Sequence, residues 1–306
     1  METILLALSA PLMVILIVFE LLYSHYAKKE LYATGDTIVN LICTSWNFLN
    51  DLLFRVVTLF VLTWASTYSF IHFETKGVVY WVLLFLAEDI AYYVLHCADH
   101  YIRFFWATHI THHSSEKFNL TVAIRSSVFQ PFYRFIFYLP LALFGFEALD
   151  IVFMYAACQV YGFWVHTETI GKLPAWFEYI FVTPSHHRVH HGSNAIYLDK
   201  NMGMALIIWD RLFGTFQEEL KEEPVRFGLT TNVKSYNPIK VVFFEWKQII
   251  SDLKDAEKRK YAFKYLFGPP GWSHNGSRKT STQLRKELNT TPICIIENEA
   301  ECAVEA

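Results

Sequence analysis

Charged residues are scarce in this chain. They make up 18% of its 306 residues, and the formal net charge is −3. Soluble domains average about 25% charged residues, so this chain has an excess of apolar surface to bury. It also lacks a basic stripe with interleaved aromatic residues, the electrostatic pattern of nucleic-acid-binding proteins. We therefore expect no nucleic-acid partner.

Cysteines are few and show no regular spacing. The chain has five, none of them in a C-x-x-C pair: Cys43, Cys97, Cys158, Cys294 and Cys302. This spacing excludes both a disulfide framework and a thiolate zinc motif. We expect reduced thiols, either in a reducing compartment or in lipid.

The chain is rich in long apolar segments. They cover residues 4–23, 41–70, 78–95, 129–144 and 148–165. About 20 apolar residues in a helix cross the 30 Å hydrocarbon layer of a bilayer. No lysine or arginine precedes the first segment and no A-x-A-like cleavage site follows it, which favours an uncleaved span over a signal peptide. The sequence predicts an all-α fold, a multi-span integral membrane helical bundle, and excludes a soluble binding module.

The charges between these segments predict an orientation. Basic residues lie between the first and second segments and between the third and fourth, and most of the others follow the fifth. The opposite loops, around 74–76 and 147, carry a single lysine. Since basic loops stay in the cytoplasm, we expect the N-terminus outside and the C-terminus inside. The compact length favours a bacterial inner membrane over the endoplasmic reticulum.

Histidines are concentrated between residues 96 and 191, and most of them form three tight groups. Residues at positions i, i+3 and i+4 of a helix share one face, so each group would present two or three imidazoles to a common point. Imidazole is the commonest metal ligand among side chains at neutral pH. We predict a di-metal site at the cytosolic face, with four or five nitrogens for each ion. The predicted ligands are His96, His100, His109, His112, His113, His166, His187, His190 and His191.

Four other residues are candidates to support these ligands. Asp89 lies two helical turns before His96 and so shares its face, where a carboxylate accepts a proton from imidazole and fixes its tautomer. Asp99 and Glu168 are similar candidates, with plain salt bridges as the alternative. We expect His186 to point away from the ligands and to act structurally or through another histidine.

The chain divides into three predicted parts. Residues 1–77 would be a membrane anchor, 78–216 the catalytic unit, and 217–306 a cytosolic C-terminal region. Within this scheme we expect a helix over 203–213 that closes the site and an amphipathic helix over 239–265. The motif at 268–272 would break that second helix, and the last thirty or so residues would be disordered.

The type of ligand limits which metal ions are possible but does not identify one. Catalytic zinc takes three protein ligands and structural zinc favours thiolates, so eight or nine imidazoles exceed what zinc needs. Imidazole also suits iron. The choice between iron and zinc stays open at the level of the residues.

The motif order resembles the fatty acid hydroxylase superfamily, which includes sterol desaturases and sphingolipid hydroxylases. The order is H-x3-H, H-x2-H-H and, after a membrane hairpin, H-x2-H-H. Residues 184–192 (PSHHRVHHG), 199–201 (DKN) and 208–216 (IWDRLFGTF) are similar to the alkylglycerol monooxygenase branch and its bacterial relatives. The resemblance covers about 78–216.

This resemblance implies two iron ions, O2 as co-substrate and oxygen insertion at a C–H bond of a lipid, possibly an alkylglycerol-type ether lipid. It implies the same nine histidine ligands. Some hydroxylases have a further histidine where this chain has Gly162, which would leave one ion more open. The electron donor would be tetrahydropterin or another reductant.

Two alternatives remain at this level. One is a desaturase or hydroxylase that acts on a sterol or carotenoid with the same metal centre. The other is a membrane protein that binds or transports metal without catalysis. Transport would need ligands spread along a path at several depths, whereas these histidines are expected to converge at one depth.

Overall fold

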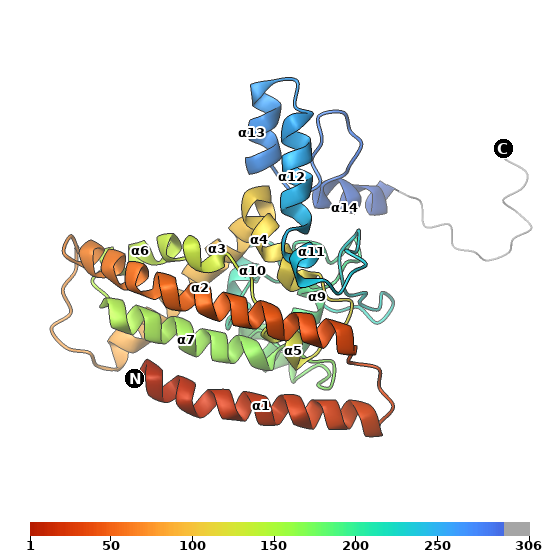
Figure 1. Cartoon of the computed structure of the whole chain (residues 1–306). Helices are drawn as coiled ribbons and strands as arrows, with labels where there is room; N and C mark the ends of the chain where they lie inside the picture. The colour runs from red at the N-terminus through yellow and green to blue at the C-terminus, as the bar shows by residue number, and fades with distance from the viewer. Residues whose placement is uncertain (291–306) are drawn as a thin grey trace, which may run out of the picture.

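The structure is a computed structural model that describes residues 1–290. The described part is helical, with no β-strand and two isolated β-bridges. Its long helices are α1 (Glu2–Tyr26), α2 (Thr34–Ser66), α3 (Val78–Tyr101) and α7 (Ala148–Trp164). Figure 1 shows α1, α2 and α7 running alongside one another. Helix α1 packs on α7, and α2 and α3 each pack on α6 (Phe135–Leu143) and α7. The all-α prediction is confirmed.

Three of these helices, α1, α2 and α3, are long and apolar enough to cross a membrane. Their large apolar side chains point outward as well as inward: Phe19, Leu53 and Val56 are each about seven-tenths exposed. An apolar outer surface of this size needs lipid around it. The chain is a membrane protein.

The fourth apolar segment folds differently from the expected span. Helix α6 has nine residues and follows a short 3-10 turn, η1 (Gln130–Phe132). Nine residues rise only about 14 Å, less than half the hydrocarbon thickness. Polar side chains of α2 bind the irregular backbone before it: Asn47 Nδ2 donates to the Ser127 carbonyl at 2.9 Å, and Asn50 Nδ2 to the Val128 carbonyl at 2.8 Å. These amides satisfy carbonyls that a full-length helix would have paired internally.

The connecting loops gather at opposite ends of the bundle. At one end Lys76 Nζ lies 2.6 Å from a Glu147 oxygen, so the two loops expected on one side lie together. At the other end Lys117 Nζ donates to the Glu30 carbonyl at 2.6 Å. The shorter helices α4 (Arg103–His113), α5 (Leu120–Ala123), α8 (Ala175–Ile180), α9 (Pro184–His190) and α10 (Ile208–Phe213) complete the described fold before residue 217.

The C-terminal part contains α11 (Pro238–Val242), α12 (Phe244–Lys254), α13 (Arg259–Phe267) and α14 (Ser281–Thr290). The amphipathic helix expected over 239–265 is therefore three shorter helices, of which α12 and α13 project away from the bundle in Figure 1. Helix α13 ends at Phe267, just before the predicted break.

Two further predictions for this half of the chain are wrong. Residues 281–290 form α14 instead of being disordered, and Arg285 Nη1 donates to the Leu198 carbonyl at 2.5 Å. The rest of the expected tail, 291–306, lies outside the described residues. The helix expected over 203–213 begins only at Ile208, because the Asp210 carboxylate accepts the backbone N–H groups of Met202 and Gly203 at 2.7 and 2.8 Å.

Candidate metal centre

The histidine-bearing elements meet at one end of the bundle. His96 and His100 occupy the last turns of α3, and α4 follows after a single residue with the second group. Helix α9 carries the third group and begins at Pro184, whose fixed φ suits a first helical position. His166 follows the end of α7. Helical spacing thus places each group on one face, and tertiary packing brings the faces together.

The nine predicted imidazoles form two groups. In each group every residue offers a ring nitrogen within 4.8 Å of all the others. The five-imidazole group is His96, His100, His109, His113 and His190, and the four-imidazole group is His112, His166, His187 and His191. Eight of these side chains are buried and His112 is half-buried.

Neighbouring imidazoles approach one another through Nε2. The Nε2–Nε2 distance is 3.0 Å for His96 and His109 and 3.1 Å for His109 and His113. In the other group it is 3.3 Å for His112 and His166 and 2.8 Å for His166 and His187. Two nitrogens bound about 2.1 Å from one ion at angles of 90–109° would lie roughly 3.0–3.4 Å apart. The spacing therefore fits nitrogens that share an ion.

The outer ring nitrogens determine which tautomer is present. Nδ1 of His112 donates to the Arg125 carbonyl at 3.1 Å and Nδ1 of His166 to the Gly162 carbonyl at 2.7 Å. Because a carbonyl only accepts, each Nδ1 carries the proton and each Nε2 keeps a lone pair. Two lone pairs facing each other at 3.3 Å cannot form a hydrogen bond. A cation between them satisfies both.

The same logic extends to the five-imidazole group. Nδ1 of His96 donates to the Met202 carbonyl at 2.7 Å and Nδ1 of His190 to the Lys200 carbonyl at 2.9 Å. Nε2 of His100 and of His190 is buried with no hydrogen-bond partner in the described structure, and so is Nε2 of His191 in the four-imidazole group. Buried polar atoms rarely lack a partner, and a metal ion would provide one.

Burial also keeps these imidazoles neutral. Desolvation lowers the pKa of His166 to about 4, and it lowers the pKa of His109, His187 and His191 well below the usual value. Burial likewise lowers the pKa of His112, His113 and His190. A neutral imidazole is the form that binds metal, so the site favours the protonation state that coordination needs.

Of the four predicted supporting residues, Asp99 lies nearest to an imidazole. Its Oδ2 is 3.8 Å from His109 Nδ1, and its carboxylate accepts from the Tyr133 hydroxyl at 2.6 Å and from Gln130 Nε2 at 2.8 Å. His109 Nδ1 also lies 3.1 Å from Ser127 Oγ.

Asp89 and Glu168 are placed differently from the expectation, whereas His186 points away from the ligands as expected. The Asp89 carboxylate accepts from the backbone N–H groups of Ala205 and Leu206 and from the Trp209 indole, so it holds the 202–209 segment instead of an imidazole. The Glu168 side chain is exposed. The His186 ring packs 5.6 Å from the Phe216 ring and belongs to neither imidazole group.

Sequence reasoning missed a polar cluster that α2 contributes. The buried Arg125 guanidinium donates from Nη1 to Asp36 Oδ1 at 2.8 Å and to Asn40 Oδ1 at 2.7 Å, and from Nε to the Thr111 carbonyl at 2.7 Å. Since the Arg125 carbonyl accepts from His112, this cluster supports a predicted ligand. The available signal was the i, i+4 pair of Asp36 and Asn40 just before an apolar run.

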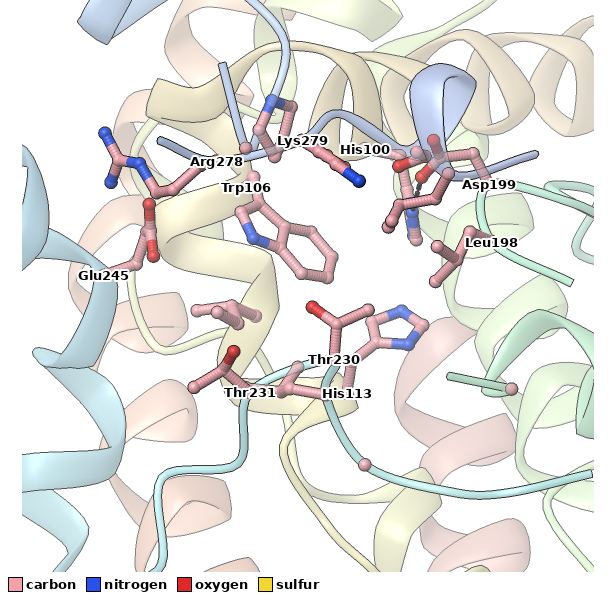
Figure 2. A pocket seen from close by; sticks show the side chains of 18 of the residues that line it. His100, Trp106, His113, Leu198, Asp199, Thr230, Thr231, Glu245, Arg278 and Lys279 are labelled. Atoms are coloured by element: carbon pink, nitrogen blue, oxygen red, sulfur yellow. Dashed lines mark hydrogen bonds and ion pairs between the residues drawn. The ribbon is translucent and has the colours of Figure 1, made fainter. Parts of the chain in front are cut away.

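A cavity of about 220 Å³ opens onto the five-imidazole group. Figure 2 shows His100 with Asp199 and Leu198 at one edge of this cavity, and His113 beside Thr230 and Thr231 at another edge. The four-imidazole group is covered instead by the buried Phe118, whose ring lies 5.7 Å from His166 and 5.1 Å from His191. Phe227 stacks on Phe118 at 4.9 Å.

Comparison with known proteins agrees with this geometry. Residues 81–215 match the family model "Fatty acid hydroxylase". The chain is 37% identical to a human alkylglycerol monooxygenase and 35% identical to one from Xenopus tropicalis, over 92% and 90% of its own length. It spans 62% and 60% of those two relatives.

A bacterial relative is more distant. The chain is 26% identical to ornithine lipid hydroxylase OlsE of Rhizobium tropici over 50% of the chain and 46% of that protein. No solved structure matches the chain significantly. The motifs, the gathered imidazoles and the matched family model agree: residues 81–215 belong to the fatty acid hydroxylase family.

Proposed function

We propose that this protein is a membrane-bound di-iron oxidoreductase that uses O2 to hydroxylate a lipid. The observation that carries the proposal is the pair of imidazole groups whose Nε2 atoms face one another at 2.8–3.3 Å beside a cavity. The overall reaction consumes O2, two electrons and two protons, inserts one oxygen atom into a C–H bond and releases the other as water. Two iron ions, when bound, would supply the reductive activation of O2.

The nine imidazoles would hold the two ions, five nitrogens for one and four for the other. The cavity opens onto the five-imidazole group, so the two ions would differ in their access to it. Backbone carbonyls orient imidazoles such as His96 and His112, which makes the outer ring nitrogen a donor and leaves the inner one free to bind, and Ser127 Oγ contacts the outer nitrogen of His109. Iron is favoured over zinc because zinc needs fewer ligands than the chain offers.

The substrate would be a lipid, possibly an alkylglycerol-type ether lipid as the human relative's name suggests. Its polar end would lie in the cavity and the reacting carbon beside the ions. The four charged side chains of the cavity wall each have an ionic partner: Arg278 with Asp252 at 2.8 Å, Glu245 with Arg103 at 2.6 Å, Lys279 with Glu287 at 2.7 Å and Asp199 with Arg285 at 3.8 Å. Threonine hydroxyls and Gln248 remain available, which favours an uncharged, hydroxyl-bearing end.

The electrons would come from an external reductant, with tetrahydropterin as the first donor to test. We place the imidazole-bearing end and the C-terminus in the cytoplasm, and we prefer a bacterial inner membrane. We keep the division into an anchor (1–77), a catalytic unit (78–216) and a C-terminal region (217–306), with the addition that α2 also supports a ligand and that the C-terminal region forms one wall of the cavity.

The test is metal analysis and product analysis on detergent-purified protein. We expect two iron ions per chain and, with 1-O-alkylglycerol, O2 and tetrahydropterin, a product that carries one oxygen atom from ¹⁸O2. A double bond in the product would identify a desaturase. Oxidation of an ornithine lipid or a sterol instead of alkylglycerol would redefine the substrate. Bound metal without turnover of any of these lipids would contradict the enzyme proposal.

A further inference from the structure

Helices α12 and α13 expose large apolar side chains on their outer surface. Phe263 and Phe267 are 64% and 47% exposed and lie one helical turn apart on α13. Phe243 and Ile250, at the start of α12 and within it, are 45% and 55% exposed. The Phe263 and Phe267 rings lie 5.0 Å apart and form one apolar patch, and exposed apolar patches mark interaction sites.

Aromatic contacts connect this surface to the membrane-spanning bundle. One row runs from Phe243 to Phe129 at 5.7 Å, then to Phe132 at 5.8 Å and to Phe54 of α2 at 4.3 Å. Helices α12 and α13 together form the α12–α13 hairpin. Since α2 is a candidate span with an apolar outer face, the exposed apolar patch of this hairpin continues a surface that contacts lipid.

A second row starts from the other helix of the hairpin. Phe267 lies 6.2 Å from Phe104, which is 5.4 Å from Phe105, and Phe105 is 6.1 Å from Phe137 of α6. The hairpin is therefore attached to the bundle on two sides, and it projects sideways from the long helices in Figure 1. A hairpin placed in this way lies along a bilayer surface that the long helices cross.

Most of the exposed charged side chains of α12 and α13 are basic. Residues 238–267 contain seven lysines and arginines and four acidic residues. Two of the acidic residues, Glu245 and Asp252, accept from the buried Arg103 at 2.6 Å each and so are neutralised internally. The seven cationic side chains are all exposed: Lys240, Lys247, Lys254, Lys258, Arg259, Lys260 and Lys264.

We propose that the α12–α13 hairpin docks onto the anionic lipid surface of the bilayer that the protein spans. Phe263 and Phe267 would enter the boundary between head groups and acyl chains, and the lysines beside them would contact lipid phosphates. Arg103 joins the hairpin to α4, and Phe244 and Gln248 of α12 line the cavity. Docking thus holds the cavity wall at the level of the lipid head groups.

Hydrogen–deuterium exchange on the full chain in vesicles tests this proposal without measuring activity. One vesicle type contains phosphatidylcholine alone, and the other also contains phosphatidylglycerol. We expect amides of 259–267 to exchange about fivefold or more slowly in the second type, since each basic residue near an anionic surface contributes about a fivefold preference. Peptides from α3 report whether the fold is intact.

Three variants separate the contributions. F263S/F267S should exchange rapidly at 259–267 in both vesicle types, and K260E/K264E should lose the difference between the two types. K221E is the matched control, because Lys221 is exposed but lies outside the hairpin, and it should behave like the unmodified protein.

Two results would overturn docking. One is exchange at 259–267 that depends neither on phosphatidylglycerol nor on Phe263 and Phe267. The other is protection that grows with the ratio of protein to lipid, which would identify a second copy of the chain as the occupant.

Discussion

The two imidazole groups differ in what covers them. The five-imidazole group opens onto a cavity of about 220 Å³, whereas the four-imidazole group lies beneath Phe118 and the Phe227 ring stacked on it. Three members of the five-imidazole group, His100, His113 and His190, line the cavity, and only His191 does so from the four-imidazole group. Two ions bound in these groups would therefore not be equivalent. One would face the substrate, and the other would be shielded from water.

The largest expected effect comes from removing one imidazole from each group. We expect H113A and H187A each to lose one of two metal ions and to reduce product formation by more than about 100-fold, since even partners of ligands contribute 10–100-fold. Metal content and turnover are the measurements, and H72A, a change at an exposed histidine outside both groups, is the control. Loss of both ions from either variant would show that the groups act as one unit.

Replacing Phe118, which covers the four-imidazole group, should weaken metal binding in that group only. F118A removes a buried ring, so we expect the free energy of unfolding to fall by about 3–5 kcal/mol. A chelator should then remove the ion of the four-imidazole group faster than the other. F163A is the matched control, because Phe163 is also buried and, in the described part of the chain, its ring contacts Trp164 and no imidazole ring. Equal acceleration in both variants would contradict a shielding role for Phe118.

Replacing Asp99 should have a smaller effect, limited to metal binding by the five-imidazole group. D99N removes the charge 3.8 Å from His109 Nδ1, and we expect metal affinity to fall by about 10- to 100-fold. The control is D150N, which removes a buried carboxylate at the opposite end of the bundle, where Asp150 pairs with Lys76 at 2.7 Å. Competition with a calibrated chelator measures the difference. Similar affinities for D99N and D150N would mean that Asp99 only supports the fold.

Glu168 should give the smallest effect. Its side chain is exposed, and exposed charges contribute little to stability. We expect E168Q to leave metal content and product formation unchanged within error. A loss as large as that of D99N would reveal a contact with the four-imidazole group that forms only when metal is bound.

The ligand candidates are readable from the sequence because spacing at i, i+3 and i+4 is a local property of a helix. Which of the two imidazole groups each histidine joins cannot be predicted from spacing in the same way. His112 and His113 are adjacent, yet they lie in different groups, as do His190 and His191. Adjacent residues point about 100° apart on a helix, so one short helix can serve two centres. Which centre each residue joins depends on the packing of α3, α4 and α9.

The carboxylates illustrate a second limit. Asp89 shares a helix face with His96, and spacing alone favours a contact between them. In the folded chain three N–H donors of the 205–209 segment reach its carboxylate instead. Likewise, a run of apolar residues does not reveal that Asn47 and Asn50 hold an irregular backbone in place of a full-length fourth span. Competing long-range partners decide both cases.

The link from Arg125 to Asp36 and Asn40 bears on how the protein can be handled. A fragment that starts at residue 78 would keep all nine histidines but would strand a buried guanidinium without its carboxylate and amide partners. An unpaired charge of that kind costs several kcal/mol, so the fragment should misfold even in good detergent. Efforts to simplify the molecule for crystallisation should trim elsewhere and leave its second helix intact.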